Sequence, residues 1–292
     1  MSVLSDHSKG LIMTLVAVLL LSPDALLVRL IGTDPWTLLF WRGLLSGGIL
    51  IFFLGAIYRR QFIAMCKAPG RAGPLSALVA AVGNVLFVCS LRQTTAANTM
   101  IILAATPLIT ALCSHLFLKE KTDRKTWFAI ATGCGGILII FSGSLDGSHL
   151  FGDLLAFCAA CCWAGNLVIV RSARPLNMIP ANAFGSLLVV PIAFLVGAEP
   201  LAVSGADALF LALLGLLVLP VSFALITLGP RYLPAPEVSL ILLLETLLSP
   251  FWVWLVIGEE PGRATLLGGL LILGTILAHT LTGIHEQRKR SV

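Results

Sequence analysis

Three charged side chains stand out within long apolar stretches of the sequence: Asp24, Arg42 and Glu245. A charge at the centre of a bilayer costs at least ~2.5–3.5 kcal/mol, so charges in membrane segments mark ion or substrate pathways. When two carboxylates share one guanidinium, one negative charge is left uncompensated, and protonation or a cationic ligand group can neutralise it. We therefore expect Glu245 or Asp24 to bind a substrate ammonium group or to couple to protons. The alternative is structural, with an Asp24–Arg42 pair that ties the first two apolar stretches together.

Four neutral side chains in these stretches are suited to contact a polar substrate. The amides of Asn84, Asn98 and Asn166 both donate and accept hydrogen bonds. Trp163 lies about one turn before Asn166, and an aromatic ring beside an amide suits a pocket for an amphipathic molecule. All four are predicted substrate contacts. The alternative for each is packing or hydrogen bonding between helices.

The composition shows what kind of element must position these residues. The chain has 292 residues, of which 58% are hydrophobic and 11% charged, with a mean hydropathy of +1.00. A soluble domain carries about 25% charged residues, and a disordered chain requires low hydrophobicity, so both classes are excluded. The apolar runs are continuous and do not alternate with polar residues, which excludes an outer-membrane barrel.

Ten apolar segments are long enough to span a bilayer, since a spanning helix needs about 20 residues. They are expected at 10–31, 35–57, 73–92, 95–118, 126–143, 150–172, 179–197, 206–228, 234–257 and 263–283. The connections between them are short. The sequence therefore predicts an all-α integral membrane protein with ten transmembrane helices.

The basic residues report topology. With ten spans, fifteen of the nineteen Lys and Arg residues fall on the side of both termini and three on the other, while Arg42 lies within a span. Because basic loops stay in the cytoplasm, both termini are predicted to be cytoplasmic, in a multi-pass protein of the cell inner membrane. This distribution explains the net charge of +5, and no nucleic-acid partner is expected.

An internal repeat divides the chain. At an offset of 142 residues, Arg29 lies over Arg171, and at an offset of 139, Arg92 lies over Arg231 and Glu120 over Glu259. The sequence therefore predicts two five-helix halves, residues 1–146 and 147–292, within one membrane domain. Because five is odd, the second half is inverted, and inverted repeats in secondary transporters place the substrate site near the membrane midplane.

Depth along the helices predicts one polar layer. Asp24 lies seven residues before the end of its segment and Arg42 seven after the start of the next, so both are about 10 Å deep at ~1.5 Å per residue. Glu245 is about 17 Å from the opposite surface, within one turn of the same depth. The repeat counterparts of these three residues carry no charge; they are Asn166, Phe184 and Thr106. We expect function to reside where the two halves differ.

Proline and glycine predict bends and close contacts. Pro107, Pro220 and Pro250 remove backbone hydrogen bonds inside spans, and kinks there are candidate hinges. Glycines within 133–136 and 268–274 are expected to let helices five and ten approach closely.

Several segments together resemble the signature of EamA-type carriers in the drug/metabolite transporter superfamily. They are Thr94–Asn98, Ala105–Leu108 and Leu118–Lys121, their second copies Leu233–Glu237, Leu244–Thr246 and Ile257–Glu260, and the Trp41-Arg42 pair. The resemblance covers nearly the whole chain. It implies ten helices, export of small metabolites across the inner membrane, and a cavity lined by spans 1, 3, 4, 6, 8 and 9. The family's amino-acid exporters, including aromatic amino-acid exporters, supply the expected substrate class.

The prediction is therefore an exporter of small metabolites, with amino acids first, that works by alternating access. A drug, nucleobase or other metabolite carrier of the same fold is the alternative within transport, and an integral-membrane enzyme or a passive channel is the alternative outside it. No P-loop, H-E-x-x-H or G-x-S-x-G motif occurs, and the seven cysteines form no paired C-x-x-C set. We expect no enzymatic activity, cofactor or metal; the oligomeric state is left open between monomer and homodimer.

Overall fold

The computed structural model describes residues 6–119, 124–144, 149–173, 176, 178–228 and 235–290, and every regular element in them is helical. Eight helices are long and apolar enough to cross a membrane, and shorter apolar stretches occupy Leu244–Ile257 and Arg263–Ala278. These ten correspond in order to the ten predicted spans. The predicted fold class is confirmed; the predicted boundary at residue 146 lies outside the described residues.

The elements follow the chain in order. The first half contains α1 (Asp6–Leu21), α2 (Asp24–Leu30), α3 (Pro35–Tyr58), a 3-10 turn (Arg59–Gln61), α4 (Phe62–Lys67), α5 (Ala72–Gln93), α6 (Ala96–Ala104), α7 (Thr106–Leu118) and α8 (Arg124–Gly143). The second half contains α9 (Leu150–Ser172), α10 (Ile179–Val196), α11 (Gly205–Ala212), a π-helical segment (Leu213–Val218), α12 (Leu219–Leu228), α13 (Ala235–Ile257) and α14 (Arg263–Arg290).

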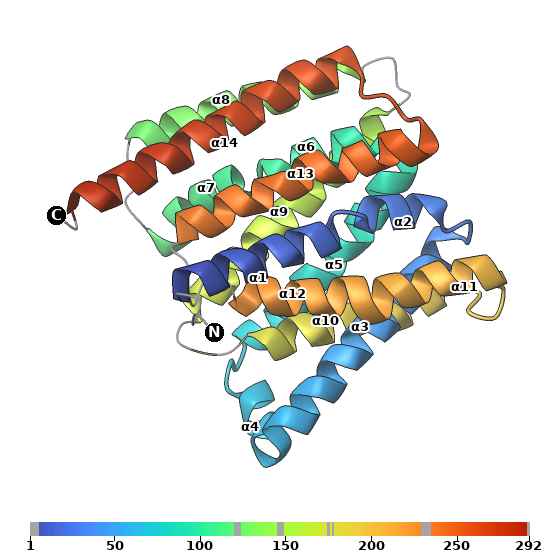
Figure 1. Ribbon diagram of the computed structural model, residues 1–292. Coiled ribbons are helices and arrows are strands. Elements are labelled where there is room, and N and C mark those ends of the chain that lie inside the picture. The colour runs from blue at the N-terminus through green and yellow to red at the C-terminus, as the bar shows by residue number, and fades with distance from the viewer. Residues whose placement is uncertain are drawn as a thin grey trace, which may run out of the picture.

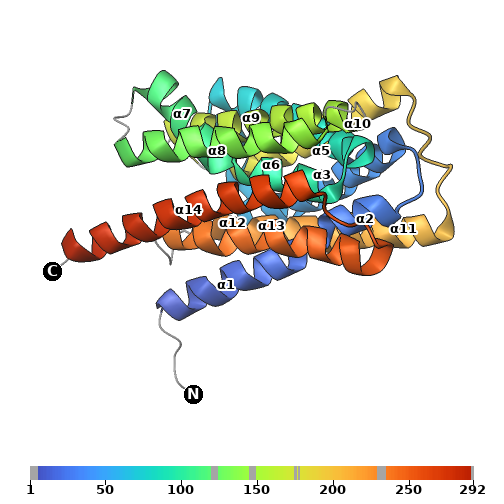
Figure 2. The ribbon, with the colours of Figure 1, turned by 90° about the horizontal axis from the view of Figure 1, so that it is seen from above.

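The two halves interleave in the bundle. α3 packs against α10, α8 against α14, α5 against α9, and α1 against α12 (Figures 1 and 2). The pairs α3–α10 and α8–α14 each join equivalent helices of the two halves. The pairs α5–α9 and α1–α12 are copies of each other, because α5 and α12 are the third spans of their halves and α9 and α1 are the first. The packing therefore follows the symmetry of an inverted repeat. α1 begins and α14 ends on one side of the bundle, which we call the terminal face; the opposite side is the far face (Figure 1).

The first predicted span is broken. Helix α1 ends at Leu21 and α2 begins at Asp24, because Pro23 lacks a backbone N–H and its ring obstructs the preceding turn. The Ser22 hydroxyl donates to the Leu19 carbonyl at 3.0 Å. From α13, the Ser249 hydroxyl donates to the Ser22 carbonyl at 2.8 Å, and the Trp252 indole donates to the Ser22 hydroxyl at 2.9 Å. The break is thus fixed by the opposite half.

The predicted proline kinks have different outcomes. The fourth span is interrupted at Ala105, between α6 and α7, two residues before Pro107. Pro220 follows the π-helical segment that joins α11 to α12, whereas Pro250 lies inside the unbroken helix α13. Two of the three prolines therefore adjoin a backbone irregularity, which is how a helix relieves the clash of the ring.

Small residues bring helices together in the interior. A Cβ atom on Gly136 of α8 would lie 2.9 Å from the Gly268 carbonyl of α14, and one on Gly268 would lie 2.6 Å from the Gly136 carbonyl. The close approach predicted for these two helices is confirmed at this pair. It does not extend to Gly274, where a Cβ atom would meet nothing within 4 Å.

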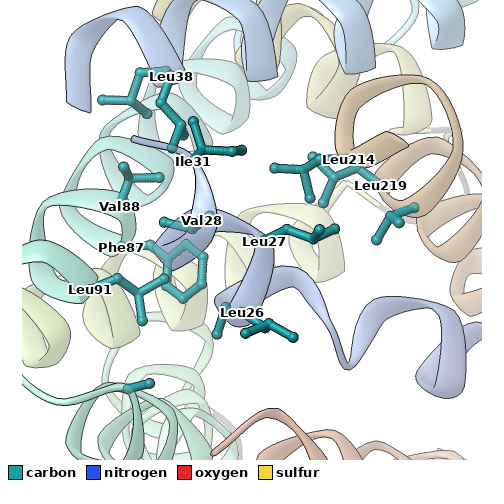
Figure 3. Close-up of a cluster of buried hydrophobic side chains, with 14 of the residues drawn as sticks. Leu26, Leu27, Val28, Ile31, Leu38, Phe87, Val88, Leu91, Leu214 and Leu219 are labelled. Atoms are coloured by element: carbon teal, nitrogen blue, oxygen red, sulfur yellow. The ribbon is translucent and has the colours of Figure 1, made fainter. Parts of the chain in front are cut away.

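The largest buried cluster surrounds α2. It includes Leu26, Leu27, Val28, Ile31, Leu38, Phe87, Val88, Leu91, Leu214 and Leu219, all less than 9% exposed (Figure 3). In Figure 3 these side chains come from α2, α3, α5 and the π-helical segment with α12, so residues of both halves pack around the short helix. This packing positions the polar residues at the start of α2.

Candidate functional site

Asp24 and Arg42 form a buried ion pair. Asp24 is the first residue of α2, directly after the break, and Arg42 lies on α3; they are 5% and 6% exposed. Arg42 Nη2 donates to Asp24 Oδ2 at 2.8 Å, and Nη1 donates to Oδ1. A two-point contact of this kind is among the strongest hydrogen-bonded pairs in proteins. The guanidinium carbon also lies 5.5 Å from the centre of the Phe87 ring, within range of a cation–π interaction.

Glu245 adds a second carboxylate to this region. It lies on α13, is partly buried, and is close enough to Asp24 for the two negative charges to repel each other. Helix α13 packs against both α1 and α2, which brings it beside the break. Within the described part of the chain, no hydrogen bond or ion pair engages the Glu245 carboxylate. The Arg42 guanidinium already binds Asp24 at both ends, so Glu245 is the uncompensated member of the group.

A small cavity lies beside Arg42. It measures about 20 Å³ and is bordered by the polar residues Arg42, Ser46, Asn84 and Ser186 and by apolar residues of α3, α10 and α12. This volume holds about one water molecule. The structure therefore places Asn84 next to Arg42, whereas Ser46 and Ser186 were not predicted. Ser46 follows Arg42 by one helical turn, a spacing that indicates a shared face; Ser186 carries no comparable signal.

Trp163 of α9 lies next to Phe87. Its ring centre lies 5.5 Å from that of Phe87, the residue that also faces Arg42. A Cβ atom on Gly83 of α5 would lie 2.8 Å from the Trp163 ring, so glycine is needed there for the indole to fit. Phe87 thus connects Trp163 to the ion pair.

Asn166 lies in a separate polar group nearer the terminal face. Its carbonyl oxygen accepts a hydrogen bond from the Ser76 hydroxyl at 2.5 Å, and its amide nitrogen donates to Asn182 at 3.2 Å. These contacts join α5, α9 and α10. The structure does not bring Asn166 together with Arg42.

Asn98 lies at the far face, in a network centred on Asp153. The fully buried Asp153 carboxylate accepts hydrogen bonds from Thr94 and Ser144 at 2.6 Å and from the Asn98 amide at 2.9 and 3.1 Å. The Asn98 carbonyl accepts from the Thr265 hydroxyl. Both ends of the Asn98 amide are therefore occupied by the protein. Asp153 was not predicted. The sequence pattern that could have indicated it is a set of polar residues that all lie at the far-face ends of their spans.

We expect Asp153→Ala to destabilise the fold by about 3 kcal/mol, because it leaves three buried donors without their charged acceptor. Thermal unfolding of the purified protein in detergent measures this. The control is Asp34→Ala, which removes the N-terminal cap of α3, where the carboxylate accepts from Trp36 and Thr37; loss of a cap costs about 1 kcal/mol. Equal stability of the two variants would contradict a structural role for the network.

Other polar contacts on the far face join the two halves. Arg29 of α2 pairs with Glu259 at 3.1 Å, and the Ala96 backbone N–H donates to Glu259 at 2.6 Å. Three more contacts cross between the halves there: the Gly32 N–H to Asp207 at 2.9 Å, the Glu199 N–H to the Thr37 hydroxyl at 2.8 Å, and the Trp41 indole to the Pro200 carbonyl at 3.1 Å. Direct bonds therefore connect the two halves at the far face.

In the part of the chain that the structure describes, no three His, Cys, Asp or Glu residues are grouped so that they could hold a metal ion. The seven cysteines are all free.

Comparison with known proteins identifies the same architecture. The family described as the EamA-like transporter family matches residues 8–142 and again residues 150–280. The described spans place these two copies on either side of the loop between α8 and α9.

Individual relatives carry little further information. The uncharacterized inner membrane transporter YedA of Escherichia coli K12 is 27% identical over 178 residues, which is 59% of this chain and 57% of the relative. The uncharacterized transporter YdfC of Bacillus subtilis 168 is 26% identical over 193 residues, 63% of each chain. Each match spans less than two thirds of the relative. A solved crystal structure with 17% sequence identity has a TM-score of 0.67 and covers 94% of this chain and 98% of its own, which shows the shared fold.

Proposed function

Because the chain belongs to the EamA-like transporter family, we propose that it is an inner-membrane secondary transporter that exports small metabolites, with amino acids as the first substrate class. One observation carries the proposal: an uncompensated carboxylate, Glu245, lies beside the buried Asp24–Arg42 pair at a break in a spanning helix. Broken helices mark the binding regions of inverted-repeat transporters, because the unwound backbone lines the site.

In this proposal Glu245 receives the ammonium group of the substrate or a coupling proton. A cation there would relieve the repulsion between Glu245 and Asp24 without disturbing Arg42. Asn84 and Trp163 would contact the rest of the substrate from α5 and α9. Asn166 and Asn98, which lie nearer the two faces, would meet the substrate on entry and on exit.

The transport cycle would rock the two halves about the midplane. The breaks at Ser22-Pro23 and Ala105 and the π-helical segment before Pro220 are the points where the backbone can bend. The excess of basic residues in the loops on the side of the termini supports a cytoplasmic terminal face and an external far face. Substrate would then bind from the terminal face and leave through the far face after its polar contacts open.

The rival substrates have different requirements. A drug or nucleobase carrier of the same fold needs an apolar or aromatic site, for which Phe87 and Trp163 are available. A phosphate ester needs several buried cations, and among the side chains described within the membrane core Arg42 is the single one and is already paired. An integral-membrane enzyme needs a clustered catalytic set at an interface.

Counterflow in proteoliposomes tests the proposal. Vesicles loaded with an unlabelled amino acid should accumulate the labelled amino acid transiently, and the exchange should saturate. Protein-free vesicles provide the control. A flux that does not saturate would indicate a channel. The absence of exchange with any amino acid would overturn the substrate class. Exchange of a drug or a nucleobase would then identify the alternative carrier.

A further inference from the structure

A groove runs between α8 and α14 on the outside of the bundle. These two helices form an outermost pair (Figures 1 and 2). The groove measures about 620 Å³ and is lined by Arg124, Lys125 and Phe128 on α8 and by Leu271, Gly274 and Ala278 on α14, among others. It is separate from the ion pair and from the small cavity beside Arg42.

The floor of the groove is formed by small residues. Gly274 would place a Cβ atom with nothing within 4 Å, whereas Gly136 and Gly268 of the same helix pair are in tight contact. The hydroxyl of Thr275 in the groove donates to the Leu271 carbonyl of its own helix at 2.6 Å. The two helices thus touch at Gly136 and Gly268 and leave a mostly apolar groove beside Gly274.

The mouth of the groove is cationic. Arg124 and Lys125 are exposed in the first turn of α8, which contains no acidic residue, and this end of the helix lies at the terminal face. The amino end of a helix carries a partial positive charge, which adds to that of the two side chains.

We propose that this groove binds an anionic phospholipid from the leaflet at the terminal face. One acyl chain lies along the stretch Leu270–Ala278 of α14, about 12 Å of helix, and the phosphate group lies between Arg124 and Lys125. Basic mouths of apolar grooves between membrane helices on the cytoplasmic side are suited to such headgroups. Charge decides against a second copy of the chain, because a two-fold axis through the groove would bring two sets of these cations together.

The experiment measures lipid retention by native mass spectrometry of the full-length protein. Detergent-purified protein is titrated with phosphatidylglycerol and, separately, with phosphatidylethanolamine. We expect tighter binding of at least one phosphatidylglycerol. The double variant Arg124→Gln/Lys125→Gln should weaken it about 25-fold, at about five-fold for each basic residue. Gly274→Phe fills the groove and should abolish the same binding event with all charges retained.

Matched controls separate the groove from general effects. Arg60→Gln/Lys67→Gln removes two exposed cations from the same face, near α4, and Gly55→Phe adds a ring at another glycine where a Cβ meets nothing within 4 Å. Both controls should bind phosphatidylglycerol like the unaltered chain, and thermal unfolding should show that all variants are folded. Unchanged lipid binding in the charge and groove variants overturns the proposal, and so does a dimer that Gly274→Phe dissociates.

Discussion

Replacing Arg42 with glutamine is expected to destabilise the protein by about 3–5 kcal/mol, because it leaves the buried Asp24 carboxylate without its cation. Asp24 is 5% exposed and receives both of its ion-pair contacts from Arg42, so water cannot take the place of the guanidinium without opening the packing around α2. Thermal unfolding in detergent, compared with the unaltered chain, measures the effect. The stability of Arg42→Lys should fall between that of the unaltered chain and that of Arg42→Gln, since an ammonium group keeps the charge but loses the two-point contact.

The double variant Asp24→Asn/Arg42→Gln distinguishes stability from function. The double variant has no Asp24 carboxylate left without its cation, so most of the stability that Arg42→Gln loses should return. Transport should not return if the pair also holds the site in its working geometry. A double variant with full transport would show that the pair only ties α2 to α3, and a single Arg42→Gln variant of unchanged stability would contradict the ion pair itself.

Replacing Glu245 with glutamine is expected to lower transport about ten-fold or more, the usual effect of losing a hydrogen bond to a charged group. The fold should not suffer, because the substitution removes the repulsion between Glu245 and Asp24. Transport is measured by counterflow and stability by thermal unfolding on the same preparation. A fall in transport without a fall in stability is the result that a structural role would not produce.

Two further variants sharpen the Glu245 experiment. Glu245→Asp keeps the charge and should retain part of the activity, whereas Glu199→Gln neutralises an exposed carboxylate on the far face and should have no effect. Where protons are the coupling ion, the pH dependence of transport should also disappear in Glu245→Gln, with Asp24 and Arg42 still present. Undiminished transport with unchanged pH dependence would exclude a role for Glu245.

The fold was predictable because a bilayer imposes simple constraints. Continuous apolar runs of about 20 residues must be helices, since no water is available to satisfy their backbone groups. The break at Ser22-Pro23 was not predicted, although Pro23 lies inside the first apolar run. A proline in a membrane helix is compatible with a bend or with a full break, and here the outcome depends on Ser249 and Trp252 of α13, which bond to Ser22.

The candidate site was predictable where depth alone decides. Asp24 and Arg42 lie at equal depth on adjacent helices, and they pair. Depth also separates Asn98 from Asn166, because Asn98 lies near the start of its span at the far face and Asn166 lies near the end of its span, towards the terminal face. What depth does not reveal is the rotation of each helix about its axis, which is set by packing against neighbours. Ser186 depends on that rotation, so it did not stand out from other polar residues near its position.

In the proposed transport cycle, the bonds between halves on the far face would make the two directions of transport kinetically unequal. In the proposed cycle, opening that face would break the Arg29–Glu259 pair and its neighbouring contacts, so we expect the state open to the far side to be a minor population. A site that is accessible in only one hundredth of the molecules has its apparent affinity reduced about 100-fold. We therefore expect substrate on the far side to be recaptured poorly, so that the proposed carrier exports at a higher rate than it imports. The final concentration ratio is unaffected, because only a coupled ion gradient can change it.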